Sequence, residues 1–264
     1  MTVSARLAGG RVHAPGAAHG RVLSVHAYAI NILVADRGWT LVGAGQPGGA
    51  RRIELITGAP LTELPVAAGD TVALRGGYLR VGGVVVDLRT AVTWTQPPTG
   101  PVPAEILPAL EDGATSRAWE GTSDLVDQIV CALDDDTALL AALLRVVGRG
   151  PGLTPSGDDA IAGLAAGLLG DSSPRAEQRL GRLRELLPLV WDRTTTLSRV
   201  LLHDVLDGDL SDPLATVLCP TSSTSARDAA VAELLAAGAT SGADLCLGLA
   251  SAARLSVEPE RISA

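Results

Sequence analysis

The sequence contains no phenylalanine and no lysine, and it has few aromatic side chains of any kind. Among 264 residues there are four tryptophans and two tyrosines, so a folded core must be built mainly from aliphatic side chains. All 21 basic residues are arginines. The absence of lysine excludes Schiff-base catalysis by a lysine of this chain and a phosphate-binding loop of the lysine-containing type.

Positive charge is also in deficit. The formal net charge is −8 at pH 7, whereas a general nucleic-acid-binding surface needs a basic footprint. The few aromatic side chains also argue against platforms on which bases stack. We therefore expect no nucleic-acid partner.

Cysteines and long apolar runs are scarce as well. Cys131, Cys219 and Cys246 are not clustered, which is typical of reduced thiols in a cytoplasmic protein. The first ten residues lack the apolar core of a signal peptide. The longest apolar run, near residues 160–169, is too short to span a bilayer. We therefore expect a soluble, cytoplasmic protein that has no membrane partner.

The chain changes character near residues 95–103, a proline-rich stretch that predicts a stiff linker. Before it, short β-rich runs alternate with glycine pairs, and the pairs at 76–77 and 82–83 predict hairpin turns. The sequence thus predicts an α+β protein, with a β-rich barrel or sandwich-like domain over 1–98 and an all-helical domain over 99–264. Within the latter, Pro188 should kink or split a long helix. Helical patterns cover 104–112, 122–147, 156–169, 174–206, 212–218, 224–237 and 241–254.

The most informative stretch begins with alternating glycines at 148, 150 and 152 and ends with Asp158 and Asp159. Glycine lets a loop come close to another surface because it has no Cβ. The segment 154–156 predicts a helix start, and a helix N-terminus offers backbone N–H groups to an anion. Adjacent carboxylates attract a divalent cation. This combination predicts a metal-assisted phosphate or carboxylate site.

The pattern S-G-x-D-x-x-x-G-L-A occurs twice, starting at Ser156 and at Ser241. Helix capping by the serine and the later aspartate is an alternative explanation for the shared part. The internal glycines, Gly163 and Gly248, would then allow two helices to pack closely. A capping box uses one acidic residue, so Asp158 is an additional carboxylate that capping does not explain. The prediction of a functional site therefore depends mainly on Asp158.

Hydroxyl groups recur further along the chain. Thr195 and Ser198 are three residues apart, and Thr194 and Ser198 are four apart, so one helix face could present either pair. Hydrogen bonding of these hydroxyls to earlier carbonyl groups of the helix is the alternative.

These blocks resemble a bacterial protein family that includes the AllH-type subunit of oxamate carbamoyltransferase, from anaerobic allantoin degradation, a branch of purine catabolism. The blocks are 150–159, 195–198 and 241–249. The family's complex interconverts oxalurate plus phosphate with oxamate plus carbamoyl phosphate, and it contains two other kinds of subunit. Ala239 and Ala243 depart from the family pattern, where a polar residue and an aromatic residue are common.

The resemblance implies a carbamoyltransferase component whose helical domain binds a phosphate- or carboxylate-bearing small molecule, such as carbamoyl phosphate, together with magnesium. Asp158 and Asp159 are the expected catalytic residues and metal ligands, and no organic cofactor is indicated. Other subunits of the transferase are expected partners. Two alternatives stay open: a non-catalytic subunit whose glycine motif forms a protein–protein interface, and a metal-dependent hydrolase. The expected substrate-binding residues are Gly150, Gly152, Thr154, Ser156, Gly157, Thr195, Ser198, Ser241, Asp244 and, from the N-terminal domain, Asn31.

Overall fold

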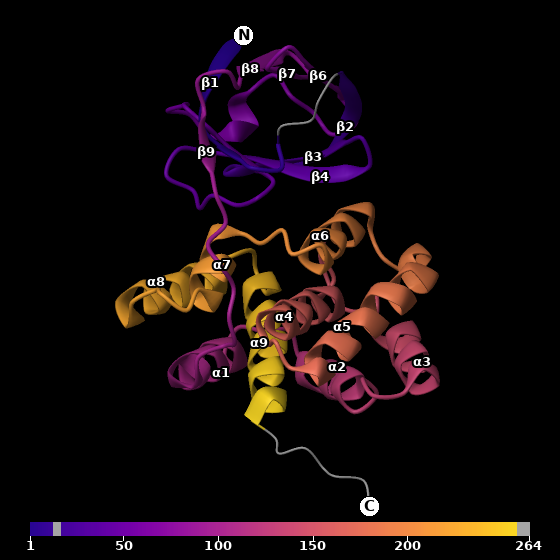
Figure 1. Cartoon of the computed structure of the whole chain (residues 1–264). Coiled ribbons are helices and arrows are strands. Elements are labelled where there is room, and N and C mark those ends of the chain that lie inside the picture. The colour runs from indigo at the N-terminus through magenta and orange to yellow at the C-terminus, as the bar shows by residue number, and fades with distance from the viewer. Residues whose placement is uncertain (13–16, 258–264) are drawn as a thin grey trace, which may run out of the picture. The chain divides into compact units, whose positions relative to one another are not determined.

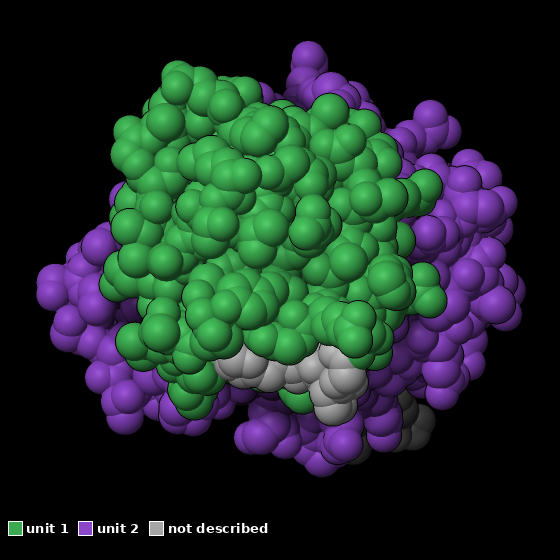
Figure 2. Space-filling model, turned by 90° about the horizontal axis from the view of Figure 1, so that it is seen from above, with its two compact units in different colours: residues 1–96, 209–212 green, residues 97–208, 213–264 purple. Residues whose placement is uncertain are grey.

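A computed structural model describes residues 1–12 and 17–257 of the chain (Figure 1). The chain divides into two compact units, which Figure 2 shows in different colours. Unit 1 comprises Met1–Gln96 and Asp209–Asp212, and unit 2 comprises Pro97–Gly208 and Pro213–Ala264.

Unit 1 is a β-barrel. Within the described residues, eight strands close into a ring in the order β1-β5-β4-β3-β2-β6-β7-β8, because β1 pairs with both β5 and β8. A further strand, β9, pairs in parallel with the end of β1. Closure leaves the ring without free edges at which another chain could pair. The strands are β1 (Thr2–Gly9), β2 (Ala18–Val25), β3 (Ala29–Val34), β4 (Arg37–Val42), β5 (Arg52–Leu55), β6 (Thr71–Arg75), β7 (Tyr78–Val81), β8 (Val84–Asp87) and β9 (Val92–Trp94).

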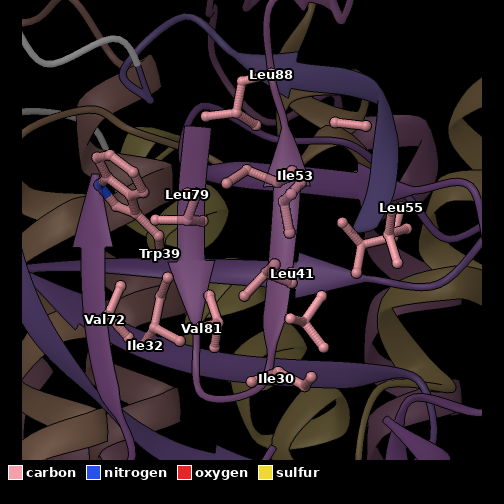
Figure 3. Packing of buried hydrophobic residues seen from close by; sticks show 14 of the residues in the cluster. Ile30, Ile32, Trp39, Leu41, Ile53, Leu55, Val72, Leu79, Val81 and Leu88 are labelled. Atoms are coloured by element: carbon pink, nitrogen blue, oxygen red, sulfur yellow. The ribbon is translucent and has the colours of Figure 1, made fainter. Parts of the chain in front are cut away.

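The barrel is filled by aliphatic side chains, as the composition requires. Alternate residues of β3, Ile30, Ile32 and Val34, point inward, which is the two-residue period of a strand with one buried face. Trp39 contributes an aromatic ring to the same cluster (Figure 3). The predicted barrel or sandwich is therefore a closed barrel.

Both predicted hairpin turns are present. Gly76 and Gly77 connect β6 to β7 with φ of +59° and +77°, a conformation that glycine adopts without strain. Gly82 (φ +52°) and Gly83 connect β7 to β8. Neither β1 nor β3 was among the β-rich runs identified from the sequence, and the alanine and glycine residues of β1 weaken its strand signal.

Unit 2 contains the long helices. The expected helix over 122–147 is wrong: two helices form, because Asp135 accepts a hydrogen bond of 2.7 Å from the backbone N–H of Ala138 and starts a new helix. The expected split near Pro188 is confirmed. The α-helices are α1 (Leu107–Thr115), α2 (Thr122–Val130), α3 (Asp136–Val146), α4 (Ser156–Gly170), α5 (Pro174–Leu186), α6 (Thr196–Leu206), α7 (Asp212–Leu218), α8 (Thr224–Leu235) and α9 (Ser241–Val257). Short 3-10 helices are η1 (Leu61–Glu63) in unit 1, and η2 (Ala104–Ile106) and η3 (Leu187–Arg193) in unit 2.

Helices α4 and α9, which carry the repeated motif, lie side by side in unit 2 (Figure 1). A Cβ built on Gly163 would lie 1.9 Å from the carbonyl oxygen of Leu245. A Cβ built on Gly248 would lie 1.9 Å from the carbonyl oxygen of Ala160. The repeat therefore packs against itself in a reciprocal manner, which confirms the predicted close approach of the two helices.

No helix in residues 1–12 and 17–257 combines the length and apolar composition needed to cross a membrane.

Candidate functional site

The three sequence blocks meet in unit 2 at the first turns of α4, α6 and α9. The hydroxyls of Thr154, just before α4, and Ser241, at the start of α9, are 2.9 Å apart. Ser198 in the first turn of α6 donates a hydrogen bond of 2.6 Å to Asp158 of α4. Three helix N-termini, each with a partial positive charge, therefore converge on a group of aspartates.

Asp158 is a buried acceptor that joins three segments of the chain. It is 1% exposed, and one oxygen accepts the backbone N–H of Gly148 at 2.9 Å. Its other oxygen accepts the hydroxyls of Ser198 and Thr194. Burial raises the pKa of Asp158, although these three hydrogen bonds oppose the rise. Asp158 is not needed for helix capping, but these hydrogen bonds give it a structural role that the sequence did not predict.

Asp159 is partly exposed and has the most perturbed carboxyl group of the cluster. Burial raises its pKa to about 8, and the neighbouring carboxylates of Asp244 and Asp158 add to the rise. The nearby hydroxyls of Ser241 and Thr154 act in the opposite direction. Its buried Oδ2 has no hydrogen-bond partner in the part of the chain that the structure describes. At neutral pH the group is therefore mostly protonated, so it can act as a proton donor.

Two further polar groups of the repeat are completely buried. Asp244 uses Oδ1 to accept the backbone N–H of Trp119 at 3.0 Å and the hydroxyl of Thr122 at 2.7 Å. Its Oδ2 and the Oγ of Ser156 have no partner among the described residues. The predicted capping role of Ser156 is wrong, because Pro155 occupies the N-cap position and Ser156 is already helical. Buried polar atoms without partners are rare, which makes these positions candidates for function.

The glycine loop before α4 has the backbone that its sequence predicts. Gly148, Gly150 and Gly152 all have positive φ, and a Cβ on Gly148 would lie 2.1 Å from the carbonyl oxygen of Arg193. A Cβ on Gly150 would lie 2.8 Å from the Oγ of Ser156. The loop is therefore packed tightly against two parts of the site.

Three backbone N–H groups in the first turn of α4 are already used within the chain. Gly157 donates its N–H to the carbonyl of Arg149 at 2.8 Å. Asp158 and Asp159 both donate theirs to the carbonyl of Pro155. These three N–H groups are therefore not open to an anion. The other backbone N–H groups of the predicted anion-binding segment are those of residues 150, 152–154 and 156, because the prolines at 151 and 155 have none.

Thr195 is the N-cap of α6 and does not share a helix face with Ser198. Its Oγ1 accepts the backbone N–H of Ser198 at 3.0 Å and donates to the carbonyl of Leu153. Thr194 and Thr195 precede α6, so most of the run of β-branched threonines lies outside the helix, where its low helix propensity does not matter. The two hydroxyls therefore have separate structural roles.

Replacing Thr195 with alanine should destabilise the protein by about 1–2 kcal/mol, because it removes the helix cap and the bond to the glycine loop. Urea unfolding would measure the loss. Thr195→Ser keeps the hydroxyl and should recover most of the stability. An alanine variant as stable as the serine variant would contradict this role for Thr195.

Asn31 lies in unit 1, on β3. Its Nδ2 donates to the Oγ of Ser24 at 2.9 Å, and its Oδ1 accepts the hydroxyl of Thr40 at 3.1 Å. The side chain is therefore held in one orientation across β2, β3 and β4.

The residues of the cluster do not fit a magnesium ion held by the protein alone. No three histidine, cysteine, aspartate or glutamate side chains of the described chain are grouped so that they could hold a metal. Asp158 already accepts three hydrogen bonds and is 1% exposed, so Asp159 is the one carboxyl group of the pair that an ion could reach. Magnesium prefers several anionic oxygen or water ligands, and these two carboxyl groups alone do not supply them.

Sequence reasoning missed the contribution of the loop between α1 and α2. Trp119 and Thr122 contact Asp244, which follows more than a hundred residues later. No local pattern signals such a pairing. Arg193 was also missed, although it directly precedes the threonine run.

The molecule is thus an α+β protein with a closed barrel and a helical unit that holds a buried aspartate and hydroxyl cluster. Residues 146–253 match the model of a family described as oxamate carbamoyltransferase subunit AllH. The matched segment contains all three sequence blocks, and the match confirms the resemblance over these residues. No solved structure matches this chain.

Proposed function

We propose that this chain is a subunit of a carbamoyltransferase and that the cluster around Asp159 binds a small anionic substrate. Asp159 is the observation that carries the proposal. It is the partly exposed carboxyl group of the cluster, its pKa is raised to about 8, and it lies where the three matched blocks meet. Strongly perturbed carboxyl groups concentrate at functional sites.

Carbamoyl transfer needs a proton carrier. When a carbamoyl group moves from carbamoyl phosphate to the amide nitrogen of oxamate, that nitrogen loses a proton and phosphate leaves. In the reverse direction the nitrogen regains the proton. A carboxyl group with a pKa near 8 can perform both steps close to neutral pH, and Asp159 is that group here.

The charge that an anionic substrate requires would come from arginines beside the glycine loop. Arg149 and Arg193 are exposed, and the backbone of Arg193 packs against Gly148. The Arg149 guanidinium is anchored to the carbonyl of Arg145, whereas Arg193 has no side-chain partner among the described residues. Arg193 is therefore the stronger candidate for contact with a phosphate or carboxylate group.

Titration calorimetry with carbamoyl phosphate and with oxamate, each with and without magnesium, tests the proposal. Arg193→Gln should raise the Kd by about tenfold or more, because a charge-assisted hydrogen bond is lost. Arg80→Gln, at an exposed position of β7 in unit 1, is the matched control and should leave the Kd unchanged. Absence of binding by the chain, both alone and assembled with its partner subunits, would rule the proposal out.

One observation favours the interface alternative. Leu153, next to Gly152 in the glycine loop, is 49% exposed although it is apolar. If this loop docks on another subunit, Leu153→Ser should abolish co-purification of the complex and leave ligand binding intact. Retained assembly in that variant would exclude the loop as the main interface.

A further inference from the structure

The three aspartates of the cluster differ in exposure and in hydrogen bonding. We propose that Asp158 and Asp244 are positioning residues that fasten surrounding loops, and that Asp159 is the single catalytic carboxyl of the site. The catalytic half of this inference rests on the proposed function. The positioning half rests on the hydrogen bonds alone.

Asp158 fastens two loops to the start of α4. Through Gly148 it holds the first residue of the glycine loop, and through Thr194 and Ser198 it holds the segment that leads into α6. At 1% exposure its side chain is closed to a ligand. The bond from Thr195 to the carbonyl of Leu153 ties the same two segments a second time.

Asp244 performs the same task on the α9 side. It holds the loop between α1 and α2 through the N–H of Trp119 and the hydroxyl of Thr122, and it is 0% exposed. In the repeat, Asp244 occupies the position of Asp159, and Ala243 occupies that of Asp158. The repeat has therefore become asymmetric: one half provides a partly exposed carboxyl, and the other provides an anchor.

The loops that Asp158 and Asp244 hold are fastened to two helix starts whose positions are fixed relative to each other. Gly163 and Gly248 lock α4 against α9, so the two helix starts cannot shift independently. The anchors then set where the loops lie relative to the carboxyl of Asp159. A small displacement of such loops is costly, because catalysis needs reacting groups to be held within fractions of an ångström.

Asparagine substitutions separate an anchor from a charged ligand or proton carrier. The carbonyl of an asparagine at 158 can accept the N–H of Gly148, and its amide can donate to the hydroxyls of Ser198 and Thr194, which then turn to accept. An asparagine at 244 can still accept from Trp119 and Thr122. A positioning aspartate should therefore keep its function when it is replaced with asparagine, whereas an aspartate that carries a proton should lose its function.

The experiment compares Asp158→Ala, Asp158→Asn, Asp244→Asn and Asp159→Asn in the assembled enzyme, with Asp124→Asn at an exposed position of α2 as control. The readouts are kcat, KM for oxamate, and hydrogen exchange in peptides covering 119–122 and 148–155. Asp158→Ala should lower kcat/KM by about 30-fold or more and speed exchange in 148–155. Asp158→Asn should recover most of both losses, and Asp244→Asn should keep exchange slow in 119–122. Asp159→Asn should lower kcat by about 100-fold or more without speeding exchange in either peptide.

Three outcomes would overturn the inference. If Asp158→Asn loses kcat as completely as Asp159→Asn, then Asp158 carries charge or protons and is not merely an anchor. If Asp158→Ala leaves exchange in 148–155 unchanged, the anchoring role is wrong. If Asp159→Asn keeps full kcat, then Asp159 is not the catalytic carboxyl. A wild-type assembly without activity on oxamate would instead refute the proposed function, and the exchange results would still decide the positioning roles.

Discussion

Replacing Asp159 with asparagine is expected to raise the free energy of unfolding in alkaline solution. The pKa of Asp159 is raised from 3.8 to about 8 in the folded protein, so the folded state holds a proton that the unfolded state releases between these values. The stability of the wild type therefore falls as the pH rises from about 4 to about 8, and the whole cost is present above pH 8. Asparagine has no such proton to lose. The gain above pH 8 should be about 2–4 kcal/mol, after allowance for partial exposure.

Urea unfolding at pH 5, 7 and 9 would measure this effect, since the difference between variant and wild type should grow with pH. Asp124→Asn, at an exposed position, should change the unfolding free energy by less than about 0.5 kcal/mol at each pH. If the unfolding free energies of wild type and Asp159→Asn change with pH in parallel, then burial of the Asp159 carboxylate does not destabilise the folded protein. A gain in stability together with a loss of activity is the usual sign that a residue is kept for function.

Replacing Gly163 with alanine is expected to cost about 3 kcal/mol or more. The new Cβ would lie 1.9 Å from the carbonyl oxygen of Leu245, and this atom belongs to the backbone of α9, which cannot rotate away. The two helices would have to separate, and overpacking of a tight core is destabilising. Gly248→Ala should have a similar cost, because its Cβ meets the carbonyl of Ala160 at the same distance. Thermal and urea unfolding would record both losses.

Gly181→Ala is the matched control for this substitution. Gly181 lies inside α5, and a Cβ there would meet no atom within 4 Å. The same chemical change should stabilise the protein by about 0.5–1 kcal/mol, because alanine favours the helix. Opposite signs at the two sites would locate the effect in the packing of α4 on α9. A cost at Gly163 no larger than about 1 kcal/mol would mean that the helices are more loosely joined.

The parts of the fold that could be predicted are those with local signals. Paired glycines located the turns of the barrel, and Pro188 located the break after α5. The expected helix over 122–147 ran through three consecutive aspartates at 134–136, and one of them, Asp135, ends that continuity by accepting the backbone N–H of Ala138 and capping α3.

The site was predicted as a set of residues but not as a set of roles. The motif residues around 156, 195 and 241 do come together. Their roles depend on partners that lie far away in sequence: Asp158 binds Thr194 and Ser198, and Asp244 binds the loop at 119–122. Such pairings arise from tertiary packing, so residue type and spacing alone could not assign them.

The reciprocal glycine packing also bears on how the protein is made. Helix α4 is buried along nearly its whole length, and the helix that packs into its glycines starts at Ser241, about seventy residues further along the chain. During synthesis α4 is therefore made before its partner α9, and its apolar surface stays exposed to solvent until α9 has been made. A chain that stopped before Ser241 would retain the glycine loop, Asp159 and their contacts with the start of α6, but it would lack α9, the helix that packs into the glycines of α4.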